Sequence, residues 1–137
     1  MTRARRPSPP AAAVRHVAGD ATPEALLIAV EAALSKKAAR PVALDLRKLD
    51  LVCDYFLIVS GSSEVQVKAI AEAIQDKLRT HGLRPWHLEG MEARHWVLLD
   101  YVEFVVHVFH EKTREYYMLD HLWGDARSMD LGLDGTD

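Results

Sequence analysis

The sequence predicts an α/β protein, more narrowly an α+β fold, in which helices cover one mixed sheet of about five strands. The chain has 137 residues, the length of a single domain. Apolar, strand-like runs alternate along it with stretches of helical periodicity. Two such runs flank a short turn at 100–103 and predict a β-hairpin. Strand–helix–strand order combined with a hairpin favours a sheet with both parallel and antiparallel neighbours.

The first 21 residues are rich in Ala, Pro and Arg and predict a disordered basic arm. Four arginines outweigh Asp20 and give this arm a charge of +3, so the rest of the chain carries −6 within a net charge of −3. We expect one folded domain over 22–126 and an acidic, flexible tail over 127–137.

The folded domain begins with a helix predicted over 23–39. Thr22 is suited to the N-cap, Pro23 to the first helical position, and Pro41 ends the helix because proline cannot continue it. The apolar residues at helical spacing are Leu26, Leu27, Val30, Ala33 and Leu34.

Two strands are predicted next, over 41–46 and 55–60, and the second is a continuous apolar run typical of a central strand buried on both faces. Either Ser62 or Ser63 then caps a helix over 62–82, in which Gly82 occupies the position after the C-cap. The apolar stripe of this helix is predicted to contain Val65, Ile70, Ala71, Ile74 and Leu78.

The last third of the chain predicts an edge strand, a hairpin and a helix. The edge strand is expected over 84–89, because Pro85 cannot donate to a second neighbour. The hairpin strands are expected over 95–99 and 103–109, and the helix over 111–123. The side chains of this helix that we expect mainly in the core are Tyr116, Tyr117, Leu119, Leu122 and Trp123.

The composition excludes several classes of protein. A net charge of −3 and a pI near 6.1 argue against a domain that binds nucleic acid by general phosphate neutralisation. We expect no direct sequence-specific nucleic-acid partner, and the acidic body disfavours a third alternative, a single-strand nucleic-acid binder that uses exposed aromatics. Cys53 is the single cysteine, so it forms no intramolecular disulfide and is expected to be a buried thiol in a reducing cytosol. No run of about 18 apolar residues predicts a membrane span. We expect a cytoplasmic location, with a mitochondrial origin as the lesser alternative.

The turn Gly61-Ser62, between a strand and a helix, is the kind of turn at which nucleotidyltransferases hold a triphosphate. Those enzymes also need two carboxylates, one residue apart on the next strand, to bind catalytic metal ions. The next predicted strand offers only Glu89. We therefore interpret Gly61-Ser62 as a turn and a helix cap, and a residual nucleotide-binding enzyme is the alternative function.

Seven histidines raise the question of a metal site. His107 and His110 are three apart on a predicted strand, so they point to opposite faces, and the helical H-E-x-x-H pattern is missing. We predict no metal, no cofactor and no catalytic residue. His107 interrupts an apolar strand, and two interpretations stay open: a hydrogen-bonded packing residue, or part of a docking face.

The first hairpin strand is apolar on both of its faces. Trp96, Leu98 and Asp100 share one face, while Val97 and Leu99 share the other. Either both faces are covered within the domain, or Trp96 is an exposed interface anchor, since Trp often dominates binding energy. In the second case a polar rim would consist of Glu89, Gly90, Arg94, Asp100 and Tyr101.

Several motifs follow one another over 22–126. They are Ala43-Leu44-Asp45-Leu46, residues 54–63, Glu89-Gly90, residues 96–101, residues 105–109, Arg114-Glu115-Tyr116-Tyr117 and residues 122–126. In this order they resemble the ribosomal silencing factor family, also called the Iojap family. Val102 departs from the family pattern, because Gly is usual in this hairpin turn; the turn type stays open, since Val resists positive φ.

The resemblance implies a nucleotidyltransferase-like fold without enzymatic activity. It implies an anti-association factor that binds large-subunit ribosomal protein fourteen at the intersubunit face and blocks joining of the small subunit. It also implies repression of translation under nutrient limitation, a role in large-subunit assembly, and a homodimer. From the hairpin and this resemblance together, the predicted docking residues are Glu89, Trp96, Leu98, Asp100, Tyr101 and His107.

Overall fold

The computed structural model describes residues 23–49, 53–117 and 127–128. The predicted basic arm and the second half of the predicted last helix lie outside these residues, as does Trp123. None of the described helices is long and apolar enough to cross a membrane. In chain order the elements are α1 (Glu24–Ser35), β1 (Ala39–Asp45), η3 (Arg47–Leu49), β2 (Tyr55–Gly61), α2 (Glu64–Thr80), β3 (His87–Glu89), β4 (Trp96–Asp100), β5 (Phe104–His110), α3 (Glu111–Tyr117) and β6 (Arg127–Ser128).

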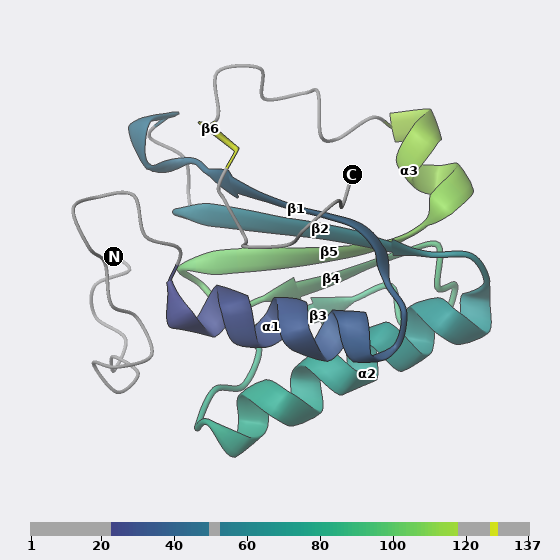
Figure 1. The fold of residues 1–137 in the computed structure, drawn as a ribbon, viewed down its shortest axis with the longest axis horizontal. Helices are drawn as coiled ribbons and strands as arrows, with labels where there is room; N and C mark the ends of the chain where they lie inside the picture. Colours follow the sequence, from purple (N-terminus) through teal and green to yellow (C-terminus); the bar gives the residue numbers. More distant parts are fainter. Residues whose placement is uncertain (1–22, 50–52, 118–126, 129–137) are drawn as a thin grey trace.

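The strands form one sheet in the order β3-β4-β5-β2-β1-β6 (Figure 1). β2 runs parallel to β5, and every other pair of neighbours is antiparallel. The α+β class, the mixed sheet, the hairpin and the edge position of β3 are therefore confirmed. The five expected strands are β1 to β5. The sixth, β6, pairs with Leu44 and Asp45 of β1 and lies at the start of the segment predicted to be a flexible tail.

Helices α1 and α2 lie side by side against one face of the sheet (Figure 1). The α2 side chains with no exposed surface include Val67, Ile70 and Ile74, and they pack on the apolar residues of β2, β4 and β5. The prediction that Leu27 of α1 and Val65 of α2 lie on the apolar stripes of their helices is wrong. Leu27 is 40% exposed and Val65 is 74% exposed. Val65 lies five residues before Ile70, which is off the stripe, whereas Val67 lies three before it.

Helix α1 ends at Ser35, four residues before the predicted end at 39. The N–H of Ala38 bonds the carbonyl of Ala33, and the N–H of Lys37 bonds that of Leu34, which is the Schellman pattern of a helix C-terminus. Lys37 occupies the left-handed position with φ +65°, where Gly is usual. The sequence carries no glycine signal there, so the end was missed. The same pattern closes α2 at Gly82, as predicted.

The hairpin between β4 and β5 turns at Val102, which adopts φ +76°. The N–H of Glu103 bonds the carbonyl of Tyr101 at 2.9 Å, so the turn closes over three residues. The carboxylate Oδ1 of Asp100 accepts from the N–H of Val102 at 2.8 Å. A β-branched residue is strained at positive φ, and this bond is one of the contacts that hold it there.

Candidate functional site: the sheet face opposite α1 and α2

The second face of the sheet is only partly covered, and we call it the open face. The strand register places side chains of five strands on it, because directly paired residues point to the same side. Five of the six predicted docking residues share this face. The open face consists of His87 and Glu89 on β3, Trp96, Leu98 and Asp100 on β4, Val105, His107 and Phe109 on β5, Phe56, Ile58 and Ser60 on β2, and Val42 and Leu44 on β1.

Trp96 and His107 are joined across β4 and β5. The indole Nε1–H of Trp96 donates to Nδ1 of His107 at 3.0 Å. Because an indole N–H can only donate, Nδ1 must be unprotonated, and the proton of the neutral imidazole lies on Nε2. Phe109 packs against the indole with ring centroids 4.8 Å apart, and Phe56 meets the imidazole edge-on at 4.5 Å. These contacts fix the orientation of Trp96.

His107 is 4% exposed, and burial lowers its pKa to about 4. It is therefore neutral at physiological pH and serves as an acceptor for Trp96. Its Nε2 finds no hydrogen-bond partner among the residues that the structure describes. Two interpretations were left open for His107, and its burial and hydrogen bond fit that of a packing residue. Through this bond His107 holds Trp96 in place on the open face.

The open face has an apolar centre and an acidic edge. Phe56, Trp96 and Leu98 are each half-buried, although they pack against the small core under this face. At the edge, Glu89 is exposed and its carboxylate lies 2.6 Å from Nε2 of His87. An apolar patch with a polar rim is the usual composition of a protein-binding surface.

Tyr101 does not lie on the open face, which corrects its predicted place in the docking set. It is 5% exposed, stacks on Phe104 with ring centroids 5.1 Å apart, and belongs to the core under α1 and α2. The physical reason is the alternation of a strand, because a residue one position after Asp100 points to the opposite side. Burial raises the pKa of the Tyr101 hydroxyl.

Two residues of β1 and β2, Val42 and Phe56, belong to the open face but were missed by sequence reasoning. The run 55–60 was interpreted as buried on both faces, and β2 is indeed a central strand. Phe56 is nevertheless only half-buried. Since Phe56 alternates with Tyr55 and Leu57 along β2, it lies away from the helices, and that alternation was the available signal.

The loop before β4 approaches the strand closely at Gly90. A Cβ at this position would lie 2.1 Å from the carbonyl oxygen of Trp96, and the φ of Gly90 is +89°. Arg94, also at positive φ, donates its backbone N–H to Gly90 and its Nε–H to Met91. Gly90 and Arg94, expected in the rim, therefore shape the loop that leads into Trp96.

Helix α3 covers one end of the open face. It packs on β5 and β2, and Arg114 is 1% exposed. The guanidinium Nη1 of Arg114 donates to the hydroxyl of Ser60 at 3.0 Å, and that hydroxyl donates to the carbonyl of Ala39 at 3.2 Å. A buried cation is costly unless it is hydrogen-bonded, so Arg114 is a structural anchor for α3.

The turn Gly61-Ser62 is occupied by the chain itself. The amide Oε1 of Gln66 accepts from the backbone N–H of Ser62 at 2.6 Å and from its hydroxyl at 3.0 Å. Ser63 is the N-cap of α2, and its hydroxyl accepts from the N–H of Gln66. A phosphate at this helix start would need the N–H that Gln66 already uses. The cap is therefore Ser63, one of the two residues predicted for it, and Ser62 is part of the turn before the helix. The N–H that a bound phosphate would use is taken by Gln66, which disfavours nucleotide binding at this turn.

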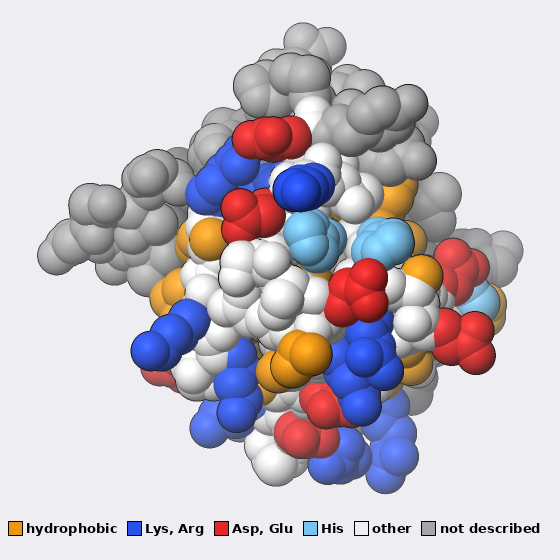
Figure 2. Space-filling view, turned by 90° about the vertical axis from the view of Figure 1, so that its right-hand side faces the viewer, with side chains coloured by type: hydrophobic (Ala, Val, Ile, Leu, Met, Phe, Trp, Pro, Cys, Tyr) orange, Lys and Arg blue, Asp and Glu red, His pale blue; other side chains and the backbone are white. Residues whose placement is uncertain are grey.

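Histidine side chains lie among acidic and basic side chains on the side of the molecule shown in Figure 2. Nε2 of His95 lies 3.0 Å from a carboxylate oxygen of Glu64, and its ring meets that of His110 edge-on at 6.2 Å. Within 23–49, 53–117 and 127–128, no group of three or more His, Cys, Asp or Glu is arranged to hold a metal ion.

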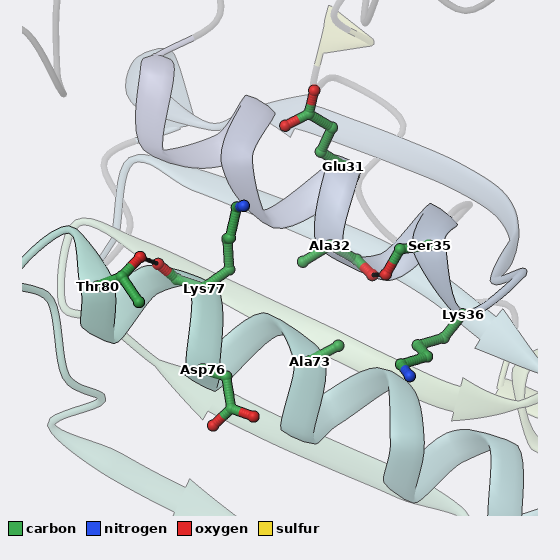
Figure 3. Close-up of a pocket in the computed structure, with 8 residues that line it drawn as sticks. All are labelled: Glu31, Ala32, Ser35, Lys36, Ala73, Asp76, Lys77 and Thr80. Carbon is green, nitrogen blue, oxygen red and sulfur yellow. Dashed lines mark hydrogen bonds between the residues drawn. The ribbon is translucent and has the colours of Figure 1, made fainter.

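A groove of about 630 Å³ lies between α1 and α2 (Figure 3). Lys77 of α2 points toward α1. Its lining mixes acids, lysines and hydroxyls with small apolar residues, and the hydroxyl of Ser35 already donates to the carbonyl of Ala32. The lining presents no convergent set of groups for a small molecule, so the open face remains the candidate site. The groove is lined by Glu31, Ala32, Ser35, Lys36, Ala73, Asp76, Lys77 and Thr80.

Comparison with known proteins finds relatives over most of the chain. The family model described as "Ribosomal silencing factor during starvation" matches residues 19–136. The ribosomal silencing factor of Halalkalibacterium halodurans is 45% identical over 108 residues, which cover 79% of this chain and 92% of that protein. A crystal structure from Bacillus halodurans superposes with a TM-score of 0.70 and 42% identity, covering 78% of this chain and 97% of that one.

A more distant relative comes from mouse and is named "Mitochondrial assembly of ribosomal large subunit protein 1". It is 34% identical over 80 residues, which cover 56% of this chain and 35% of that protein. The family model spans the folded domain and the open face described above. This chain belongs to the ribosomal silencing factor family.

Proposed function

We propose that this protein docks through its open face on large-subunit ribosomal protein fourteen at the intersubunit face, in the cytoplasm. Bound there, it blocks joining of the small subunit and represses translation when nutrients are limiting, and it also assists assembly of the large subunit. The observation that carries the proposal is Trp96, half-buried and held by His107 on an apolar face, in a chain of this family.

The chemistry of the open face supports a basic protein as partner. Trp is among the residue types that most often dominate binding energy, and Leu98 and Phe56 extend the apolar contact. Glu89 lies at the rim of the open face. The chain after the basic arm carries a net charge of −6. A negative body approaching a basic ribosomal protein associates faster at low salt, because exposed charges are screened as salt rises.

The mechanism requires affinity and volume but no bond-making step. The helices α1 and α2 lie on the face opposite the docking residues (Figure 1). A domain docked by the open face therefore projects its helix layer away from the contact. We propose that this layer occupies the space that the small subunit needs, so that joining is blocked sterically.

The first test is sedimentation of ribosomal subunits through a sucrose gradient with the purified protein added. We expect the protein to migrate with the large subunit and the fraction of joined ribosomes to fall. Trp96→Ala should weaken the affinity for the large subunit about tenfold or more, as truncation of a hot-spot tryptophan does, and the co-migration should be lost. Val65→Ala, which removes an exposed apolar side chain of α2, is the matched control and should behave as the unmodified protein.

A Trp96→Ala protein that melts at a similar temperature yet still co-migrates fully would remove the open face from the proposal. Free protein at the top of the gradient, with joining unaffected, would remove the silencing function itself. Binding of the isolated ribosomal protein fourteen separates the two cases, because it measures the proposed contact without the rest of the subunit. In that assay Glu89→Lys should lower the association rate, with the larger effect at low salt.

We also propose that a homodimer of this chain uses the open face, so that dimerisation and docking compete. An apolar patch that includes Trp96 and Leu98 is suited to self-association when no ribosome is present. Sedimentation velocity over a range of concentrations tests this. Trp96→Ala should shift the protein toward monomer, and a dimer unaffected by Trp96→Ala would place the dimer contact elsewhere.

A further inference from the structure

The segment from the end of α2 to β3 differs in charge from the rest of the body. From Lys77 to Leu88 the chain contains no Asp or Glu, although the chain after the basic arm carries −6. We call residues 79–88 the edge loop. It contains two arginines, Arg79 and Arg84, and two histidines. The edge loop is therefore the part of this body that a negatively charged partner can approach with the least repulsion.

Trp86 in the edge loop is the most exposed large hydrophobic side chain among the described residues, at 76%. Its backbone is nevertheless fixed, because its N–H bonds the carbonyl of Asp100 at 2.7 Å. Pro85 before it restricts the backbone further. The indole is therefore presented to solvent from a firmly held position at the free edge of the sheet. Trp is among the residue types that most often dominate binding energy, so an exposed Trp on a fixed backbone is a candidate contact residue.

The edge loop carries its two arginines on either side of Gly82, and Arg84 is the nearer of the two to Trp86 in sequence. Arg84 is exposed two residues before Trp86, and it forms no ion pair with any residue of the described ranges. Arg79 is partly neutralised by Asp76 at 3.0 Å, which leaves Arg84 as the main free cation.

We propose that the edge loop is an RNA contact, in which an unpaired base stacks on the indole of Trp86 while Arg84 binds a neighbouring phosphate. An exposed aromatic ring with a guanidinium two residues away, on a segment that contains no Asp or Glu of its own, suits the binding of single-stranded RNA. Asp76 and Glu89 approach this segment at its two ends, where they pair with Arg79 and His87. A protein partner would be favoured by a broader apolar patch, whereas Leu88, at 40% exposed, is the only other exposed large hydrophobic residue of this loop.

This contact goes beyond the proposed docking on a ribosomal protein and does not depend on it. The edge loop and the open face are adjacent, because side chains of β3 point alternately to the two sides of the sheet. His87 and Glu89 point to the open face, while Leu88 points to the other side with its partner Leu99. When the protein is docked by its open face, the edge loop therefore lies at the margin of the contact. There it would reach RNA next to the ribosomal protein.

The test uses the full chain and a fluorescent twelve-nucleotide oligoadenylate RNA, with binding followed by anisotropy at low salt. Trp86→Ala should weaken binding roughly 5- to 100-fold, the range that one stacked base supplies. Trp86→Phe should restore most of the affinity, because it keeps an aromatic face. Arg84→Ala should weaken binding and reduce the salt dependence by about 0.7 in the logarithmic slope, as loss of one phosphate contact predicts. Val65→Ala is the exposed apolar control.

Equal RNA affinity of Trp86→Ala and the unmodified chain would overturn the proposal and assign RNA binding to the basic arm or to another surface. Unchanged RNA affinity together with weaker binding of large subunits would overturn it in favour of a protein contact at Trp86. The docking proposal is read separately from Trp96→Ala in the sucrose gradient. Loss of RNA binding with Trp86→Ala, while the isolated ribosomal protein still binds, supports the edge loop as a second, independent contact.

Discussion

The two faces of the sheet are both apolar, but one is covered by helices and the other is only partly covered. On the helix side, Val97 and Leu99 of β4 have no exposed surface because α1 and α2 cover them. On the open face, Trp96 and Leu98 of the same strand stay half-buried. The difference teaches that strand hydrophobicity alone does not identify the core. The number and position of the covering helices decide which apolar face remains available for a partner.

The comparison predicts a large stability loss on the helix side. Leu99→Ala removes a fully buried side chain, and we expect the free energy of unfolding to fall by about 2–5 kcal/mol. Urea denaturation followed by circular dichroism measures this. The folded fraction should still bind the large subunit, since Leu99 faces away from the docking residues. A loss below about 1 kcal/mol would contradict the assignment of this face as the main core.

The open face should instead respond to pH through His107. Its pKa is lowered from 6.5 to about 4 in the folded protein, so the folded state binds fewer protons than the unfolded one between those values. Stability is complete above pH 6.5 and is lost as pH falls toward 4, by about 3 kcal/mol at most. Thermal melts from pH 7.5 to 4 measure the loss. In His107→Phe this part of the pH dependence should disappear.

A smaller effect is expected at the loop that supports β4. Gly90→Ala would bring a Cβ against the carbonyl of Trp96 at positive φ, and we expect a loss of about 2 kcal/mol. Because the clash is with β4 itself, docking should weaken along with stability. Melting temperature and subunit binding are measured on the same protein, with Ala93→Gly as a control in the same loop. Wild-type values for both would mean that the loop is free to move away.

The smallest expected change is a gain. Val102→Gly relieves a β-branched residue at φ +76°, and we expect stability to rise by about 1 kcal/mol. Denaturant midpoints measure it. Both faces of the hairpin should keep their roles, so binding of the large subunit should not change. A loss of stability would mean that the Val102 side chain contributes packing that outweighs the backbone strain.

Much of the fold followed from local signals, and the misses have physical reasons. Ser63 and Gly82 marked the ends of α2 because each supplies a property that the helix end needs. The end of α1 was missed because Lys37 adopts the left-handed conformation without being glycine. Val65 was misplaced because one apolar residue in a first turn does not define the stripe.

The candidate site was predictable on one strand and not across strands. Period-two alternation grouped Trp96 with Leu98 and Asp100 correctly. Grouping Tyr101 with them ignored the same alternation. Phe56 lies on β2, about forty residues before Trp96 in the sequence, and only the pairing of β2 with β5 brings it to His107. The exposure of Trp86 was not predicted, because the edge strand was expected over 84–89, whereas β3 begins at His87 and leaves Trp86 outside the strand.

Gln66 has a consequence for how force passes through the molecule. Its amide nitrogen donates to the carbonyls of both Lys36 and Lys37, while its oxygen holds Ser62. One side chain thus clamps the end of one helix to the beginning of the other. A load applied to one helix on this side of the protein is therefore shared with the other. The proposed steric block requires a stiff helix layer, and this amide contributes to its stiffness.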